Sequence, residues 1–118
     1  MVPAHSRAAR LAACLLASAC ILAVSQPCRA GDVKAGRAKA MACQACHGLD
    51  GLAKTPDAPN IAGQIEHYLV TQLQAYRSGA RKNDAMSVVA PSLSDQDIED
   101  LAAYYSAIEI SVGKLPGQ

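Results

Sequence analysis

Two cysteines and a histidine in the stretch CQACH, residues 43–47, are the side chains best placed to do chemistry in this chain. The spacing Cys-x-x-Cys-His occurs in thiol–disulfide centres, in zinc sites and in covalent haem attachment. Thiol–disulfide centres usually belong to a βαβ unit, of which the sequence has no sign. A structural zinc needs four ligands, and beyond Cys43, Cys46 and His47 the exported part of the chain offers only His67.

Covalent haem attachment is therefore the favoured interpretation of the motif. Positions three and four apart share one face of a helical turn. Cys43 and Cys46 would project together and form thioethers to two vinyl groups, while His47 would bind the iron from the same side.

A second axial ligand would complete the coordination of such an iron. Met41 lies too close to the attachment turn to reach round the porphyrin, and His67 is expected at the surface beside Glu66. Met86 lies in a segment without helical periodicity, which favours a ligand over a core-filling methionine. Met86 is therefore the predicted distal ligand of an iron that His47 binds.

The first thirty residues have the order of a cleaved secretory signal peptide. Arg7 and Arg10 form a basic head, residues 11–24 form an apolar run, and Ala30 precedes the expected cut. A membrane-spanning helix needs about 20 apolar residues, so a transmembrane anchor is disfavoured. The sequence predicts export to the periplasm, with residues 1–30 removed.

Cleavage would leave residues 31–118 as one domain with Cys43 and Cys46 as its only cysteines, because the other three lie in the leader. A lipid anchor at Cys20 is a weaker alternative, since small residues precede that cysteine. The remaining chain has a slight acidic excess, which excludes the basic footprint of a nucleic-acid-binding protein.

The composition raises the question of what fills the core. The chain has no Phe, no Trp and four Tyr among 118 residues. A domain this small is marginally stable without a disulfide, a metal or another staple. A large apolar cofactor would supply the missing core.

Three segments have the apolar period of a helix, and no segment has the alternation of a strand. Helices are predicted over residues 33–41 and 64–78, and a third follows Ser94, with its apolar face running to Ile108. Ser94 and Asp97 predict a cap at the start of the third helix. The fold class is all-α, with three or more helices and long loops.

Several motifs together resemble a class I c-type cytochrome, in particular one half of the di-haem cytochrome c-four type. The resemblance covers nearly all of residues 31–110. It rests on CQACHGLDG (43–51), PNIAGQ (59–64), YLVTQLQAYRSGAR (68–81), Met86 and LSDQDIEDLAAYYSAI (93–108).

The resemblance implies the cytochrome c fold, with its helices wrapped around one covalent haem. It implies that Cys43 and Cys46 carry haem c and that His47 and Met86 bind the iron. The carbonyl of Pro59 would accept a hydrogen bond from the other ring nitrogen of the ligand histidine. Gly36 in the first helix would meet Leu101 and Tyr104 in the last. One attachment motif implies one haem.

The expected function is that of a periplasmic electron carrier, not an enzyme, which meets redox partner proteins transiently. A haem subunit bound permanently to a dehydrogenase or oxidase is the main alternative, and an open iron site for catalysis or gas sensing is the third. No membrane span is expected after signal cleavage.

A basic cluster at the end of the second helix, Arg77, Arg81 and Lys82, has two interpretations. Cations suit a helix C-terminus and can simply be solvated there. Alternatively, Arg81 neutralises a haem propionate.

Overall fold

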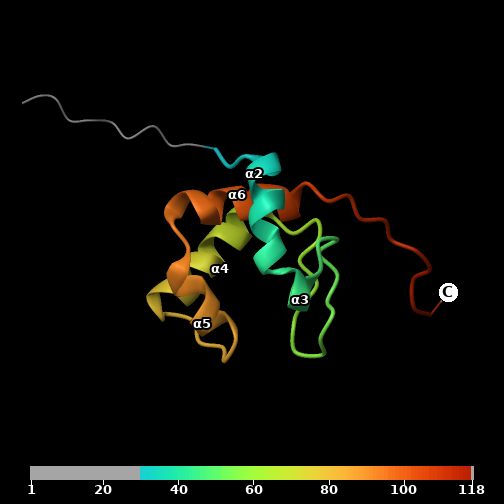
Figure 1. The fold of residues 1–118 in the computed structure, drawn as a ribbon. Helices are drawn as coiled ribbons and strands as arrows, with labels where there is room; N and C mark the ends of the chain where they lie inside the picture. The colour runs from blue at the N-terminus through green and yellow to red at the C-terminus, as the bar shows by residue number, and fades with distance from the viewer. Residues whose placement is uncertain (1–29, 118) are drawn as a thin grey trace, which may run out of the picture.

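The described part of the chain is helical, and residues 30–117 contain no strand (Figure 1). The structure is a computed structural model, and residues 1–29 and 118 are not described. The predicted signal peptide, and with it Cys20, therefore lies outside the described residues apart from Ala30. The elements are α2 (Val33–Lys39), η2 (Ala40–Ala42), α3 (Gln44–His47), α4 (Glu66–Ser78), α5 (Met86–Val89), η3 (Ala90–Ser92) and α6 (Asp95–Ser106).

Helix α2 crosses α6 at Gly36, where the two backbones come into direct contact (Figure 1). A Cβ added at Gly36 would lie 1.9 Å from the carbonyl oxygen of Asp100 and 2.7 Å from the Cβ of Tyr104. The predicted approach to α6 is thus confirmed at Tyr104, while the backbone of Asp100, rather than Leu101, is the nearest neighbour. Glycine at this position permits the close crossing despite its cost to the helix.

An ion-pair network holds the same crossing together. Lys39 Nζ lies 2.7 Å from an oxygen of Asp97 and 2.6 Å from one of Asp100, whose side chain is almost fully buried. Asp100 also accepts hydrogen bonds from the backbone N–H of Asp32 and from Gln96. Both carboxylate oxygens of Asp100 therefore have donors, as a buried carboxylate requires.

Helix α6 begins as predicted. Ser94 accepts the N–H of Asp97, and the Asp97 carboxylate accepts the N–H of Ser94, which completes a capping box. The buried positions of the helix include Ile98, Leu101 and Tyr105. This helix supplies most of the core.

Helix α4 begins at Glu66, two residues later than predicted, and ends at Ser78, with Gly79 as its C-cap. The φ of Gly79 is +79°, the left-handed conformation of the predicted C-cap. Near this end, Arg77 donates to the Leu93 carbonyl at 3.1 Å and to Asp95 at 2.6 Å. The C-terminal end of α4 is thereby fastened to the start of α6.

The segment around Met86 is not the irregular loop that its lack of period predicts. It forms α5 and η3, each a single turn. A helix of four residues is too short to show periodicity, so the pattern could not reveal it.

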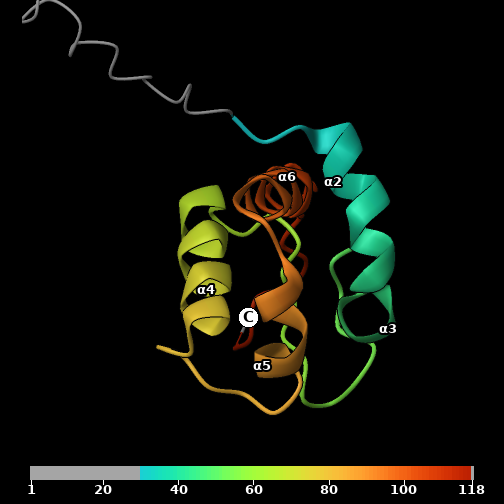
Figure 2. The ribbon, with the colours of Figure 1, turned by 60° about the vertical axis from the view of Figure 1, so that its left-hand side comes forward.

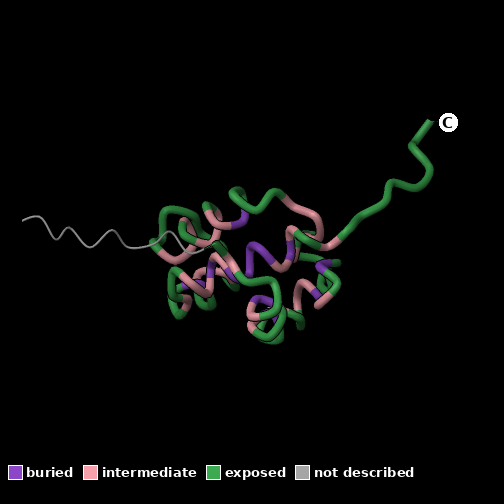
Figure 3. The backbone as a smooth tube through the Cα atoms, turned by 90° about the horizontal axis from the view of Figure 1, so that it is seen from above, coloured by how far each residue is buried: buried purple, intermediate pink, exposed green. Residues whose placement is uncertain are grey.

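The protein core is small and built mostly from short side chains. Its buried hydrophobic residues are Ala40, Leu69, Ala90, Ile98, Leu101, Ala102, Ala103 and Tyr105. Figure 3 shows these buried positions as short stretches within a mostly exposed chain, with an exposed tail after α6. None of the helices within residues 30–117 is long and apolar enough to cross a membrane.

Candidate functional site

The attachment motif lies on a tight helical turn. The N–H groups of Cys46 and His47 both donate to the carbonyl of Cys43, at 3.3 and 3.0 Å. This winding brings Cys43, Cys46 and His47 to the wall of one cavity of about 730 Å³. Both cysteines are free thiols and half-buried. The predicted common face of the three side chains is therefore present.

The rest of the cavity wall is largely apolar. Leu69 and Leu73 of α4 face it, and so do Leu101 and Tyr105 of α6. In Figure 2, α3 and α4 lie on opposite sides of the molecule, with α6 above and α5 below them. The cavity thus takes its lining from η2, α3, α4, α5 and α6 and from the loops between them.

Met86 reaches this cavity from α5, whereas the two rejected ligand candidates do not. Met86 is half-buried. Met41, in η2, is 52% exposed, and His67 is exposed on α4. Neither of these two lines the cavity, so Met86 alone among the candidates can face a group bound by His47.

The tautomer of His47 follows from its hydrogen bond. His47 Nδ1 lies 3.0 Å from the carbonyl oxygen of Pro59, as the resemblance implied. A carbonyl can only accept, so Nδ1 must carry the proton and Nε2 keeps its lone pair. A histidine fixed in this way is the usual form of a metal ligand.

The loop that carries Pro59 is tied back to the attachment turn. Lys54 N–H donates to the Cys46 carbonyl at 2.7 Å, and Ile61 N–H donates to the Gly51 carbonyl at 2.8 Å. These bonds explain how a segment without secondary structure holds Pro59 in register with His47.

Two tyrosine hydroxyls of α6 fasten the start of the same loop, and no sequence pattern indicated these contacts. Tyr104 donates to the Leu49 carbonyl at 2.7 Å, and buried Tyr105 donates to the Gly48 carbonyl at 3.1 Å. Burial raises the pKa of Tyr105, which keeps its hydroxyl protonated as a donor.

A second unpredicted contact positions Met86. The side-chain oxygen of Asn83 accepts the N–H groups of Ala85 and Met86, at 3.1 and 3.0 Å. Ser87 Oγ accepts the N–H of Asn83 at 3.0 Å. An asparagine whose side chain accepts N–H groups two and three residues on is a common start of a turn, and this signal could have been read from the sequence.

Dithiol and zinc chemistry both fit the site poorly. Burial, and then the neighbouring Cys46, raise the pKa of the Cys43 thiol, whereas reactive cysteines have a lowered pKa. Within residues 30–117 no three His, Cys, Asp or Glu side chains gather closely enough to hold a metal ion.

A haem fits the residues that are present. The cavity has a volume in the range of ligand pockets, with apolar walls and a few convergent polar groups. Two thiols, an imidazole with a free lone pair and a thioether all meet it. This is the donor set of a covalently attached haem with His and Met ligands.

Comparison with known proteins gives three consistent matches. The family described as Cytochrome c matches residues 33–107. Cytochrome c4 of Pseudomonas aeruginosa is 46% identical over 84 residues, which cover 71% of this chain and 42% of that protein. Cytochrome c-554(548) of Halomonas halodenitrificans is 47% identical over 83 residues, which cover 68% of this chain and 100% of that protein.

A solved structure has a similar fold. Reduced recombinant cytochrome c4 from Pseudomonas stutzeri superimposes with a TM-score of 0.65 at 45% identity, covering 71% of this chain and 49% of that chain. The chain thus spans less than half the length of the cytochrome c4 relative and the whole length of the c-554(548) relative.

Proposed function

The chain belongs to the cytochrome c family, and from this membership we propose that it is a single-haem electron carrier of the bacterial periplasm. The predicted resemblance and the predicted all-α class I cytochrome fold are confirmed by the family match and the solved relative. The cofactor is one covalently bound haem c.

Cys43 and Cys46 would hold this haem through thioethers, and His47 and Met86 would bind its iron. The observation that carries the proposal is the convergence of all four side chains on one apolar cavity. When bound, haem supplies a one-electron couple between ferrous and ferric iron. The apolar walls disfavour the extra charge of ferric iron, and the soft thioether of Met86 favours ferrous iron, so both raise the potential.

The roles of the residues that support the site follow from their contacts. Pro59 keeps His47 in the tautomer that binds iron. Asn83 fixes the backbone of Met86, and Tyr105 fixes the end of the attachment turn. A site closed on both sides by protein ligands suits electron transfer, because no substrate then needs to reach the iron.

The periplasmic location rests on the leader pattern of residues 1–30, and residues 31–118 would form the mature mono-haem domain. The partners are redox proteins that donate and accept single electrons. Encounters of this kind use small, short-lived interfaces.

The first test is the visible spectrum of the holoprotein, oxidised and reduced, followed by exposure of the reduced form to carbon monoxide. A far-red thioether–ferric band and no response to carbon monoxide are expected. Met86→Leu should remove the band and admit carbon monoxide, whereas Met41→Leu should change neither. Ready carbon monoxide binding by the unaltered protein would favour the catalytic or gas-sensing alternative.

A second test separates a free carrier from a permanent subunit of a dehydrogenase or oxidase. Size-exclusion chromatography of the native protein should give the mass of a free carrier. Elution within a stable large complex would favour the subunit alternative.

A further inference from the structure

The three cations of the basic cluster, Arg77, Arg81 and Lys82, separate in the structure. Arg77 is paired with Asp95 and, like Lys82, lines a surface depression of about 510 Å³ rather than the haem cavity. Arg81 alone of the three lines the haem cavity. The cluster is therefore not one solvated helix end.

Arg81 is held in place by neighbours from α4. Its backbone N–H donates to the Ala75 carbonyl at 3.0 Å, and its Nη1 donates to the side-chain oxygen of Gln72. The guanidinium carbon lies 4.7 Å from the centre of the Tyr76 ring, a cation–π contact. Gln72 and Tyr76 line the same cavity. The side chain is thus oriented before any ligand binds.

The charge of Arg81 is not neutralised by the protein within the described residues. The ion pairs there involve Lys39, Lys54 and Arg77, but not Arg81. Arg81 is exposed and also lines the cavity, so its guanidinium is free to pair with an anionic group of the ligand.

Haem c carries two propionate groups on the edge away from its thioether links. With the thioethers at α3, the propionates would lie on the far side of the cavity, where a cation is needed to pair with them. Figure 2 shows the chain leaving the C-terminal end of α4 on the side away from α3. Arg81 follows α4 by three residues, so its place in the fold suits the propionate edge.

We propose that Arg81 is the counter-ion of one haem propionate, with Gln72 and Tyr76 as the residues that position it. Guanidinium groups suit this role because they match the planar, two-oxygen geometry of a carboxylate. A fixed positive charge near the haem disfavours ferric iron, so Arg81 would raise the midpoint potential. The proposal rests on the proposed attachment of haem through Cys43 and Cys46.

The test compares Arg81→Gln with Lys82→Gln in the holoprotein. Both variants remove one positive charge, one residue apart, but only Arg81 lines the cavity. The midpoint potential is measured by redox titration from pH 5 to pH 8. Arg81→Gln should lower the potential at pH 7 several times more than Lys82→Gln does.

The pH dependence gives a second readout. An unpaired propionate takes up a proton more readily, so the potential of Arg81→Gln should rise more steeply as the pH falls. Equal potentials and equal pH profiles for the two variants would overturn the proposal. If Arg81→Gln yields no holoprotein, Arg81→Met and Lys82→Met decide in its place, since each removes one positive charge and keeps a long side chain. A lower potential in Arg81→Met than in Lys82→Met supports the proposal, and equal potentials overturn it.

The spectrum of each sample separates this proposal from the proposed function. If the unaltered protein lacks the far-red band, the proposed ligation has failed. If the band is present in every sample and the potential does not move in Arg81→Gln, only the role of Arg81 has failed.

Discussion

Among single residues, Asn83 makes the most direct contact with the backbone of Met86, so its removal should weaken iron ligation. Asn83→Ala deletes the acceptor that holds the N–H groups of Ala85 and Met86. A lost hydrogen bond costs about 0.5–1.5 kcal/mol, and here the cost falls on the turn that carries the proposed ligand Met86. The far-red band of the ferric protein should weaken, and the reduced protein should bind some carbon monoxide.

Asn83→Asp is the matched control, because aspartate keeps an acceptor oxygen and caps helices as well as asparagine does. Its spectrum should match that of the unaltered protein. An unchanged band in Asn83→Ala would mean that the rest of α5 positions Met86 without this side chain.

Tyr105 should stabilise the attachment turn through its hydroxyl. Tyr105→Phe leaves the Gly48 carbonyl without this buried donor, and an orphaned buried group costs about 1–3 kcal/mol. The free energy of unfolding of the holoprotein, measured with denaturant, should fall by that amount. Tyr68→Phe is the control, since Tyr68 is 45% exposed. Equal stabilities of the two variants would argue against the fastening role.

The side chains that would bind the cofactor could be predicted from the sequence far better than the residues that hold those side chains in place. Cys43, Cys46, His47 and Met86 were singled out by spacing and chemistry, and all four line one cavity. Tyr105 could not be found in this way, because its bond to Gly48 joins segments 57 positions apart. Such a contact depends on how α6 packs, which no local pattern encodes.

At the scale of helices, the crossing of α2 and α6 has no room for a side chain at Gly36. Gly36→Ala places a Cβ 1.9 Å from the Asp100 carbonyl oxygen, so the helices must move apart. Overpacking costs about 1–3 kcal/mol, against which better helix propensity returns up to about 1 kcal/mol. A net loss of stability should appear as a lower melting temperature of the holoprotein.

Gly113→Ala provides the comparison for this change. No heavy atom lies within 4 Å of the Cβ that would be added there. Its melting temperature should equal that of the unaltered protein. A neutral Gly36→Ala would show that the crossing can relax without cost.

The ion pairs between the same two helices should make stability depend on acid pH. Hydrogen bonds from Lys39 and then from Ser94 hold the pKa of Asp97 well below its ordinary value of 3.8. Burial raises the pKa of Asp100, but hydrogen bonds from Asp32, Lys39 and Gln96 lower it overall. A depressed carboxyl pKa stabilises the fold above the unfolded value, and this contribution is lost as the pH falls below about 4.

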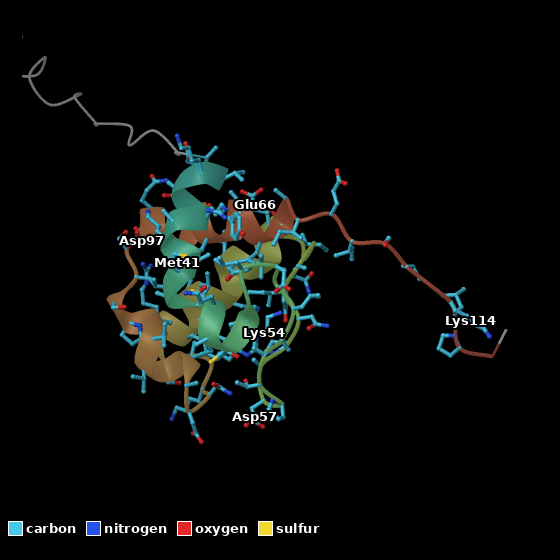
Figure 4. The ribbon with its side chains drawn as sticks, turned by 45° about the vertical axis from the view of Figure 1, so that its right-hand side comes forward. Met41, Lys54, Asp57, Glu66, Asp97 and Lys114 are labelled. Atoms are coloured by element: carbon cyan, nitrogen blue, oxygen red, sulfur yellow. The ribbon has the colours of Figure 1, made fainter. Side chains whose placement is uncertain are left out.

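Asp97→Asn should therefore flatten the decline in stability between pH 4 and pH 2. Thermal melting of the holoprotein at several pH values measures this slope. Figure 4 shows Asp97 beside α2 and Asp57 at the far tip of a loop, so Asp57→Asn serves as the control that keeps the full slope. If the melting temperatures of the two variants fall equally with pH, groups other than Asp97 cause the acid sensitivity.

The sequence predicted the longer helices because their apolar faces and caps are local features. The Ser94–Asp97 capping box and the Gly79 C-cap both lie where their residue types indicated. Helix α5 was missed, since a single turn has no period to detect. Its geometry comes from Asn83 and from packing beside the cavity.

For the whole molecule, the haem cavity takes the place that aromatic side chains fill in other small domains. Ile98 is the only large side chain with less than 2% exposure among the described residues. Helices α4 and α6 pack together at Leu69 and Leu101, and the same apolar faces also line the cavity. Removal of the cofactor would expose the part of these faces that lines the cavity.

The chain should therefore fail to fold stably without covalent haem. A Cys43→Ser and Cys46→Ser double variant removes both attachment points while leaving the charge and volume nearly unchanged. Small domains are only marginally stable without a disulfide, a metal or a similar stabilising group. Far-UV circular dichroism of the double variant should therefore show reduced helix content, and heating should give no cooperative transition. Met86→Leu is the control, because it alters ligation but keeps both thioethers and should retain the helices. Full helix content with a sharp melting transition in the double variant would mean that residues such as Ile98 and Leu101 suffice as a core.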